Sequence, residues 1–154
     1  MKNILNKLFN YQSLEKEEAR ESLINLASGY YNSSQMAAFM TVFMMRNITV
    51  DELSGFRDAM LELCVKIPAE GYNAVDLCGT GGDGKDTFNI STLASFVVAG
   101  AGYHVAKHGN YGVSSVCGSS NVLEYFGCKF SNDVGRIMKI FDQSNIAFLH
   151  APMF

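Results

Sequence analysis

Residues that could bind an anion are concentrated between Asp76 and Thr92. Four glycines occur within six positions there, at 79, 81, 82 and 84, directly after a short apolar run. Glycines let the backbone approach a ligand closely, and successive N–H groups can then point into one concavity. Amide and hydroxyl side chains follow at the start of a second apolar run, as at a helix N-terminus that favours an anion. The segment therefore predicts a phosphate site.

A carboxylate, Asp83, lies inside this glycine-rich segment. A carboxylate beside a phosphate is favourable only when a metal ion or a sugar hydroxyl lies between them. The two common phosphate loops do not account for the segment: Gly84-Lys85 is followed by Asp86 rather than Ser or Thr, and a lone Gly-x-Gly-x-x-Gly match is weak. The spacing therefore indicates a phosphate site of another kind, with a metal or a sugar as a second component.

A second polar block follows the next apolar segment, residues 102–106. It begins with Lys107-His108-Gly109-Asn110 and continues through serines at 114, 115, 119 and 120. Lysine supplies a point charge for a phosphate, and the amide and hydroxyls supply uncharged hydrogen bonds. We expect a strand that runs into a loop here. As the next strand end of a βαβ unit, this loop would lie beside the first one.

The first 70 residues have the pattern of helices. Ser13 precedes an acidic first turn, Ser33 or Ser34 precedes a second helix, and Thr49 to Glu52 is a capping box for a third that runs to about Lys66. The second helix, residues 35–46, is apolar nearly all round. Such a helix has to be buried, either in the domain or against another subunit.

From residue 71 the pattern changes to alternating strands and helices. Strands are expected at 74–78, 103–106 and 146–150, with helices at about 93–101, 121–126 and, after a cap at Ser131 or Asn132, through Phe141. The predicted fold is therefore α/β: an all-helical N-terminal subdomain, residues 1–70, followed by the first part of a parallel α/β sheet domain, residues 71–154. A sheet of three strands, with the last strand at the end of the given sequence, is expected to be incomplete.

Composition excludes several classes of function. Of the 154 residues 48% are hydrophobic and 18% charged, which is typical of a globular protein. The net charge of −3 gives no general affinity for nucleic acid or anionic membranes, and no apolar run reaches membrane-spanning length. The four cysteines lack paired metal-ligand spacing. We therefore expect a cytoplasmic enzyme with no nucleic-acid or membrane partner.

The stretch from Asp76 to Thr92 resembles the signature of the anthranilate phosphoribosyltransferases. Their pattern Asp-x-x-Gly-Thr-Gly-Gly-Asp-Gly, then Thr-Phe-Asn-Ile-Ser-Thr, is matched without a gap. The second block is similar to the family's Lys-His-Gly-Asn-Arg block, with Tyr111 where Arg is expected. The resemblance covers all 154 residues but only the first half of a family member, so it implies a truncated chain that is inactive alone.

The resemblance implies an enzyme that transfers phosphoribosyl from PRPP (5-phosphoribosyl-1-pyrophosphate) to anthranilate in tryptophan biosynthesis, with Mg²⁺ as cofactor. It also implies a homodimer formed through the helical domain. Ser91 is the expected Mg²⁺ ligand, and no catalytic acid or base is expected. The implied PRPP-binding residues are Gly79, Thr80, Gly82, Asp83, Thr87, Asn89, Ser91, Thr92, Lys107 and Ser119. The implied anthranilate-binding residues are Gly79, His108 and Asn110.

Two other functions are also compatible with the sequence. One is a pyrimidine nucleoside phosphorylase of the same fold, which binds phosphate and a nucleoside. The blocks around Ser91 and Asn110 favour the transferase because they are similar to the transferase forms. The other is a non-catalytic relative that binds nucleic acid, which the acidic balance of the chain disfavours.

Overall fold

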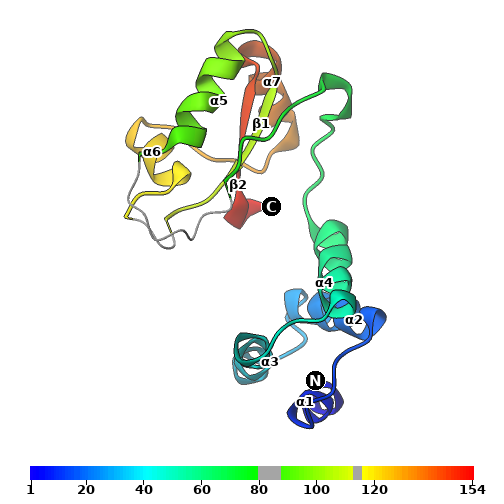
Figure 1. Ribbon diagram of the computed structural model, residues 1–154. Coiled ribbons are helices and arrows are strands. Elements are labelled where there is room, and N and C mark those ends of the chain that lie inside the picture. Colours follow the sequence, from blue (N-terminus) through cyan, green and yellow to red (C-terminus); the bar gives the residue numbers. More distant parts are fainter. Residues whose placement is uncertain (80–87, 113–115) are drawn as a thin grey trace. The chain divides into compact units, whose positions relative to one another are not determined.

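The computed structural model describes residues 1–79, 88–112 and 116–154. It divides into two compact units, Met1–Cys64 and Val65–Phe154. The first is entirely helical and the second is α/β, which confirms the predicted fold class (Figure 1). None of the helices in the described residues is long and apolar enough to cross a membrane.

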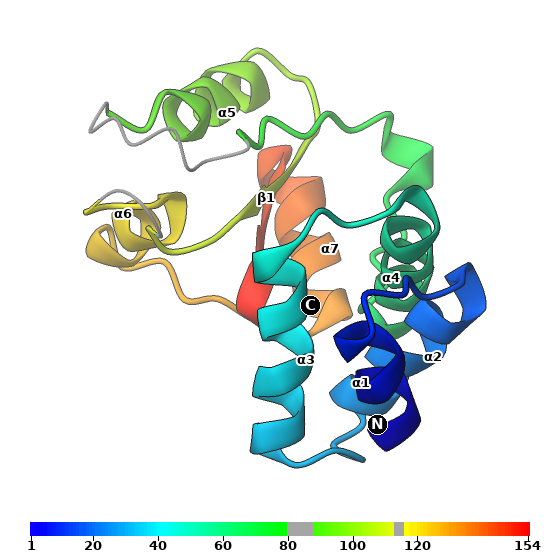
Figure 2. The same cartoon turned by 60° about the horizontal axis from the view of Figure 1, so that its bottom comes forward.

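The helical unit contains four helices around one apolar cluster. They are α1 (Lys2–Phe9), α2 (Lys16–Ala27), α3 (Ser33–Met45) and α4 (Val50–Leu63), seen from two directions in Figures 1 and 2. Side chains from α1, α2, α3 and the α1–α2 connection meet in the cluster. Its buried members are Leu8, Leu14, Ala19, Leu26 and Phe39.

Helices α2 and α4 pack with their backbones unusually close. A Cβ on Gly55 of α4 would lie 2.1 Å from the carbonyl oxygen of Lys16 and 2.8 Å from the Cβ of Ala19. Only a residue without a side chain fits at this crossing. The packing of α4 on α2 therefore depends on Gly55.

The starts of the helices correct two predicted caps. The capping box of Thr49 and Glu52 is confirmed, with the Thr49 hydroxyl accepting from the Glu52 N–H at 3.2 Å. In α2 the cap is Glu15 rather than Ser13, and in α3 it is Asn32 rather than Ser33 or Ser34. Both corrections have one cause: a reciprocal bond to the residue three positions on fixes the cap, to Glu18 and to Gln35.

Glu52 is fully buried and joins three parts of the helical unit. Its carboxylate accepts hydrogen bonds from the Leu14 N–H at 2.8 Å, the Thr49 N–H at 2.9 Å and the Arg46 guanidinium at 2.5 and 2.9 Å. Burial raises the pKa of the Glu52 carboxyl, and the bonds from Arg46, Leu14 and Thr49 outweigh burial, lowering it to about 2. The carboxylate is therefore charged at neutral pH.

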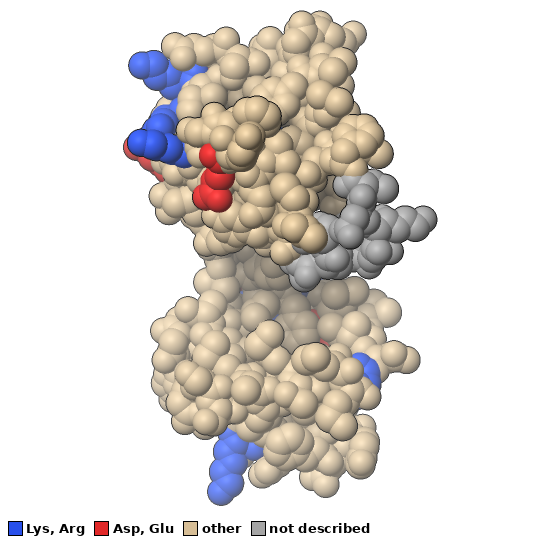
Figure 3. Space-filling model, turned by 90° about the vertical axis from the view of Figure 1, so that its left-hand side faces the viewer, with Lys and Arg blue, Asp and Glu red and all other residues tan. Residues whose placement is uncertain are grey.

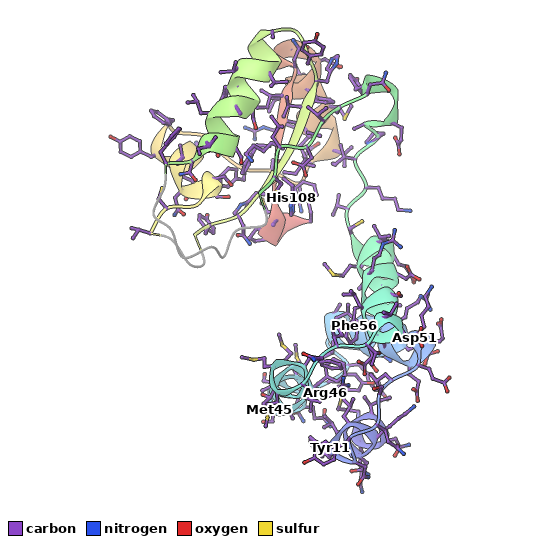
Figure 4. All side chains as sticks on the ribbon, viewed as in Figure 1. Tyr11, Met45, Arg46, Asp51, Phe56 and His108 are labelled. Carbon is purple, nitrogen blue, oxygen red and sulfur yellow. The ribbon has the colours of Figure 1, made fainter. Side chains whose placement is uncertain are left out.

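Helix α3 is much less buried within this chain than its composition predicts. Only Phe39 is buried, whereas Met40, Met44 and Met45 are 63%, 86% and 82% exposed. Figure 4 places Met45 on the side of α3 away from the other helices. Of the two predicted alternatives, burial of α3 on every face inside the domain is therefore wrong.

The described residues of the α/β unit form two parallel strands and three α-helices. The elements in chain order are η1 (Glu70–Tyr72), α5 (Ile90–Gly100), β1 (Val105–Gly109), α6 (Ser119–Tyr125), α7 (Val134–Ser144), β2 (Ile146–His150) and η2 (Ala151–Met153). The register pairs Val105 with Ile146 and Gly109 with His150. Ile137 and Phe141 of α7 pack against Ala147 of β2 as a second core. The cap of α7 is Asp133 rather than Ser131 or Asn132, since its carboxylate accepts from the Arg136 N–H.

The first predicted strand, residues 74–78, is reduced to one bridge. Val75 pairs in parallel with Val105, through Val75 N–H to His104 O at 3.0 Å and Ala106 N–H to Val75 O at 3.0 Å. Val75 is 43% exposed, and within the described residues the bridge to Val105 is its one sheet pairing. The segment still runs beside β1 and ends at the same edge, where the glycine-rich segment begins.

Candidate functional site

Strand β1 contains the first three residues of the second polar block, Lys107 to Gly109. Lys107 and His108 lie within β1 rather than in a loop after it, because the parallel pairing with β2 continues to Gly109. Lys107 is 3% exposed, and its ammonium donates to the carbonyl of Leu77 at 3.1 Å. The N–H of His108 donates to the carboxylate of Asp76 at 3.3 Å. Lys107 and Asp76 therefore tie residues 76–77, at the entry to the glycine-rich segment, to β1.

The start of α5 carries the hydroxyl and amide side chains that follow the glycines. Ser91 is half-buried and faces Gly79, since a Cβ on that glycine would lie 3.8 Å from the Ser91 hydroxyl. Asn89 caps α5 without a side-chain bond to the helix; its amide donates to the carbonyl of Cys117 at 3.4 Å instead. Thr92 is buried beneath the helix start. The bond from Asn89 links the first polar segment to the approach to α6.

The start of α6 is joined to the segment that leaves β1. The hydroxyl of Ser119 and the N–H of Ser120 both donate to the carbonyl of Asn110, at 3.4 and 3.1 Å. The side-chain oxygen of Asn121 accepts from the N–H groups of Gly112 and Gly118, at 3.1 and 2.9 Å. These bonds hold two predicted site residues, Asn110 and Ser119, side by side.

The structure therefore brings three predicted segments to one end of the α/β unit. Both strands finish there, and α5 and α6 begin there (Figure 1). His108 is exposed and lies at the same end of the strands as η2 (Figure 4). Four further predicted site residues lie outside the described residues: Thr80, Gly82, Asp83 and Thr87.

Several residues that build this end of the unit were not among the predicted site residues. Tyr111 donates its hydroxyl to Glu124 at 2.8 Å, and this bond raises the pKa of Tyr111 above its usual value. His150 is buried and bonds Ser120 through its ring nitrogen Nδ1 at 2.9 Å. The available signals were Tyr111 in the place of an expected arginine and the position of His150 at the end of a predicted strand.

The described residues contain no group of three His, Cys, Asp or Glu side chains that could hold a metal ion by themselves. Ser91, the predicted Mg²⁺ ligand, would offer a single neutral oxygen. Magnesium in phosphate-transfer sites takes few protein ligands and is held largely by substrate phosphates and water. One hydroxyl at the start of α5 is compatible with an ion that arrives with a phosphorylated substrate.

A cavity of about 290 Å³ lies in the α/β unit. Its walls come from α5, α7, β2 and the segment after α6, and they are mainly apolar. Thr92 and Lys107 reach its lining, whereas Ser91, Asn110 and Ser119 do not. The cavity therefore adjoins the predicted site through Thr92 and Lys107 but does not include its other described residues.

Both units match domains of one protein family. Residues 2–64 match the helical bundle domain of a glycosyl transferase family, and residues 71–154 match its a/b domain. The chain belongs to this glycosyl transferase family. Within the family, curated relatives called anthranilate phosphoribosyltransferase align with all 154 residues, at 68% identity in Flavobacterium johnsoniae and 56% in Cytophaga hutchinsonii. The chain spans 47% of each of these two relatives.

Solved structures of two relatives share the fold. The anthranilate phosphoribosyltransferase of Thermus thermophilus superposes with a TM-score of 0.73 at 29% identity, and that of Saccharomyces cerevisiae with 0.79 at 24%. Each comparison covers 97% of this chain and 46% of the other. The Saccharomyces protein was solved in complex with PRPP and Mg.

Proposed function

We propose that this chain supplies the PRPP-binding half of an anthranilate phosphoribosyltransferase. In that reaction the amine nitrogen of anthranilate forms a bond to C1 of the ribose, the bond from C1 to the pyrophosphate oxygen breaks, and the nitrogen releases a proton to solvent. The work of the protein is to position the two reactants and to stabilise the charge of the departing pyrophosphate.

The observation that carries the proposal is the convergence of Ser91, Asn110 and Ser119 at the end of β1 and β2. The Asn89 amide donates to the carbonyl of Cys117, 28 residues further along the chain, and so links the start of α5 to the approach to α6. The Asn110 carbonyl accepts from the Ser119 hydroxyl and so links the segment after β1 to α6. Ligands of open α/β sheets bind outside the carboxyl ends of the strands. The 68% identity to an anthranilate phosphoribosyltransferase supports the assignment of this site to PRPP.

Each predicted site residue that the structure describes has a role in the proposal. Asn89, Ser91, Thr92 and Ser119 bind oxygens of PRPP, and Gly79 gives the ligand room beside Ser91. Lys107 acts from within the protein: its charge favours the bound anion, and its bond to Leu77 holds the entry to the glycine-rich segment. His108, Asn110 and Gly79 form the anthranilate side. The roles of Thr80, Gly82, Asp83 and Thr87 remain predictions.

Magnesium bound with PRPP neutralises pyrophosphate charge and so makes it a better leaving group. Ser91 is the residue of this chain that would hold it. Ser91 lies in the first turn of α5, where its carbonyl accepts a hydrogen bond from the Ser95 hydroxyl at 2.6 Å. Cytoplasmic location and the absence of a nucleic-acid partner also remain predictions.

Calorimetric titration of PRPP into the full gene product that carries this chain, with and without Mg²⁺, tests the proposal. We expect binding that depends on Mg²⁺. Ser91→Ala is expected to weaken it about tenfold, since it removes a hydroxyl that contacts charged groups. Ser28→Ala, an exposed serine at the end of α2, is the matched control and is expected to bind PRPP as the parent does.

Two results would contradict this assignment. Binding of inorganic phosphate with a pyrimidine nucleoside, without PRPP binding, would identify a nucleoside phosphorylase. Binding of nucleic acid by a protein that gives no heat with PRPP would identify a non-catalytic relative. In the first case Ser91→Ala still weakens phosphate binding; in the second it changes nothing.

We further propose that the helical unit forms a homodimer through α3. Figure 3 views the molecule from the side on which α3 lies in Figure 1, and few charged side chains are visible over the helical unit. Met40, Met44 and Met45 are exposed on α3, and Val50 is 80% exposed at the start of α4. Monomeric proteins rarely leave a continuous apolar surface of this kind in water.

Light scattering after gel filtration of the full gene product tests the dimer. For the parent we expect twice the mass of one copy of the full gene product. For the double variant Met44→Glu, Met45→Glu we expect the mass of a single copy, because two carboxylates cannot be buried unpaired. Tyr125→Glu, an equally exposed site on α6, is the control and is expected to stay dimeric. A monomeric parent at micromolar concentration contradicts the proposal.

A further inference from the structure

We propose that His150 is a positioning residue for the PRPP site, acting through its hydrogen bond to Ser120. The proposal rests on the function proposed above, since Ser119 and Asn110, which the bond holds, are assigned to that site. His150 ends β2, and Ser120 lies in the first turn of α6. The bond therefore fastens the start of α6 to the end of the sheet.

The His150 ring is held in one orientation by two aromatic side chains. Phe130 stacks on it, with ring centroids 4.3 Å apart and an angle of 17° between the planes. Tyr111 meets it edge-on, at 4.9 Å and 80°. The side chain is only 5% exposed. Both contacts restrict the plane of the ring, and in this plane Nδ1 faces the Ser120 hydroxyl.

Ser120 makes two hydrogen bonds, one to the end of β2 and one to the segment that follows β1. Its hydroxyl is fully buried and lies 2.9 Å from Nδ1 of His150, while its N–H donates to the Asn110 carbonyl at 3.1 Å. Asn110 and Ser119 are one hydrogen bond apart. A shift of Ser120 therefore moves both residues assigned to substrates.

The space around the Ser119 side chain leaves little tolerance for such a shift. A Cβ on Gly109, the β1 partner of His150, would lie 2.2 Å from the Ser119 hydroxyl. The hydroxyl thus sits directly over the strand end. Loss of the bond between His150 and Ser120 leaves three kinds of contact to hold the start of α6: the backbone bonds, the side-chain bonds of Ser119 and Asn121 to residues 110–112, and the contact of Tyr111 with Glu124. None of these fixes the Ser120 side chain.

Steady-state kinetics of the full gene product, expressed per folded molecule, tests the proposal. His150→Phe keeps a ring for Phe130 but removes the bond, and Ser120→Ala removes it from the other side. We expect either variant to raise the KM for PRPP about fivefold with kcat little changed, the loss of one buried hydrogen bond. His150→Asn, which places a polar atom near the position of Nδ1, is expected to restore the KM. The double variant Ser120→Ala, His150→Phe is expected to equal either single variant.

His104→Phe is the matched control, since the His104 ring also packs between aromatic side chains, those of Tyr72 and Phe141, but belongs to no proposed site. It is expected to leave the KM unchanged. An unchanged KM in His150→Phe, a His150→Asn variant no better than His150→Phe, or additive effects in the double variant would each overturn the proposal.

Hydrogen exchange separates this proposal from the proposed function. Amides of residues 119–121 are expected to exchange faster in His150→Phe and Ser120→Ala and at the parent rate in His150→Asn, whatever the substrate. If the parent forms no phosphoribosylanthranilate, the function is wrong and exchange alone decides whether His150 fixes α6. Equal exchange in all the variants overturns the positioning role even in an active enzyme.

Discussion

Replacing Glu52 by Gln is expected to lower the free energy of unfolding of the helical unit by about 3 kcal/mol, the cost of breaking a buried ion pair by removing one partner. The amide of Gln would place an N–H₂ group against the Arg46 guanidinium, leaving that cation without its counter-charge. The bonds to the Leu14 and Thr49 N–H groups would also weaken, because a neutral oxygen is a poorer acceptor than a carboxylate. Hydrogen exchange of amides in α2 and α4 measures the change in the full gene product.

The matched control is Glu62→Gln on the same helix. Glu62 pairs with Arg20, but both side chains are partly exposed, and pairs of that kind contribute about 0–1 kcal/mol. Equal losses from the two substitutions would contradict the account of Glu52.

The dependence of stability on pH gives a second check on Glu52. Its pKa is about 2 in the folded unit, against about 4.3 for an unperturbed glutamate in an unfolded chain. Since the folded value is the lower one, the stabilisation is complete above about pH 5 and is lost as the pH falls toward 2. The difference between the parent and Glu52→Gln is therefore expected to shrink with acidification; a constant difference from pH 7 to 3 would exclude a charged Glu52 as its cause.

The fold class was predictable because its signals are local. The change from helical to alternating pattern near residue 70, and the capping box at Thr49, depend on residues close together in sequence. The caps Glu15 and Asn32 were missed because Ser is the commoner cap, whereas a partner three residues on decided the outcome. The extent of β1 was underestimated because its pairing with β2 carries two polar residues, Lys107 and His108, inside a strand.

The polar segments of the site were predictable from residue types, but their supports were not. Ser91, Asn110 and Ser119 stand in blocks of glycine, amide and hydroxyl residues that indicate a ligand. Ser120 and His150 are 30 residues apart and have no spacing that indicates a bond. Tyr111 was noticed only as a substitution for arginine. Its ring on His150 and its hydroxyl on Glu124 depend on how α6 and β2 pack, which no local pattern encodes.

Gly118→Ala is expected to raise the KM for PRPP at least about tenfold, since a methyl group forced into filled space costs about 1–3 kcal/mol. The backbone angles of Gly118, φ −85° and ψ 176°, are open to alanine, so the cost is purely one of space. A Cβ there would lie 2.4 Å from Gly112 N, 2.4 Å from Tyr111 C and 2.6 Å from Asn110 O. All three are backbone atoms, which cannot turn aside as a flexible side chain would.

The added methyl group can be accommodated only if the start of α6 separates from residues 110–112. That movement breaks the bonds of Ser120 and Ser119 to the Asn110 carbonyl and so separates the two substrate-binding segments. Gly100→Ala at the end of α5, where no atom lies within 4 Å of the added Cβ, is the control and is expected to leave the KM unchanged. An unchanged KM in Gly118→Ala would mean that the contact between α6 and residues 110–112 is not needed to bind PRPP.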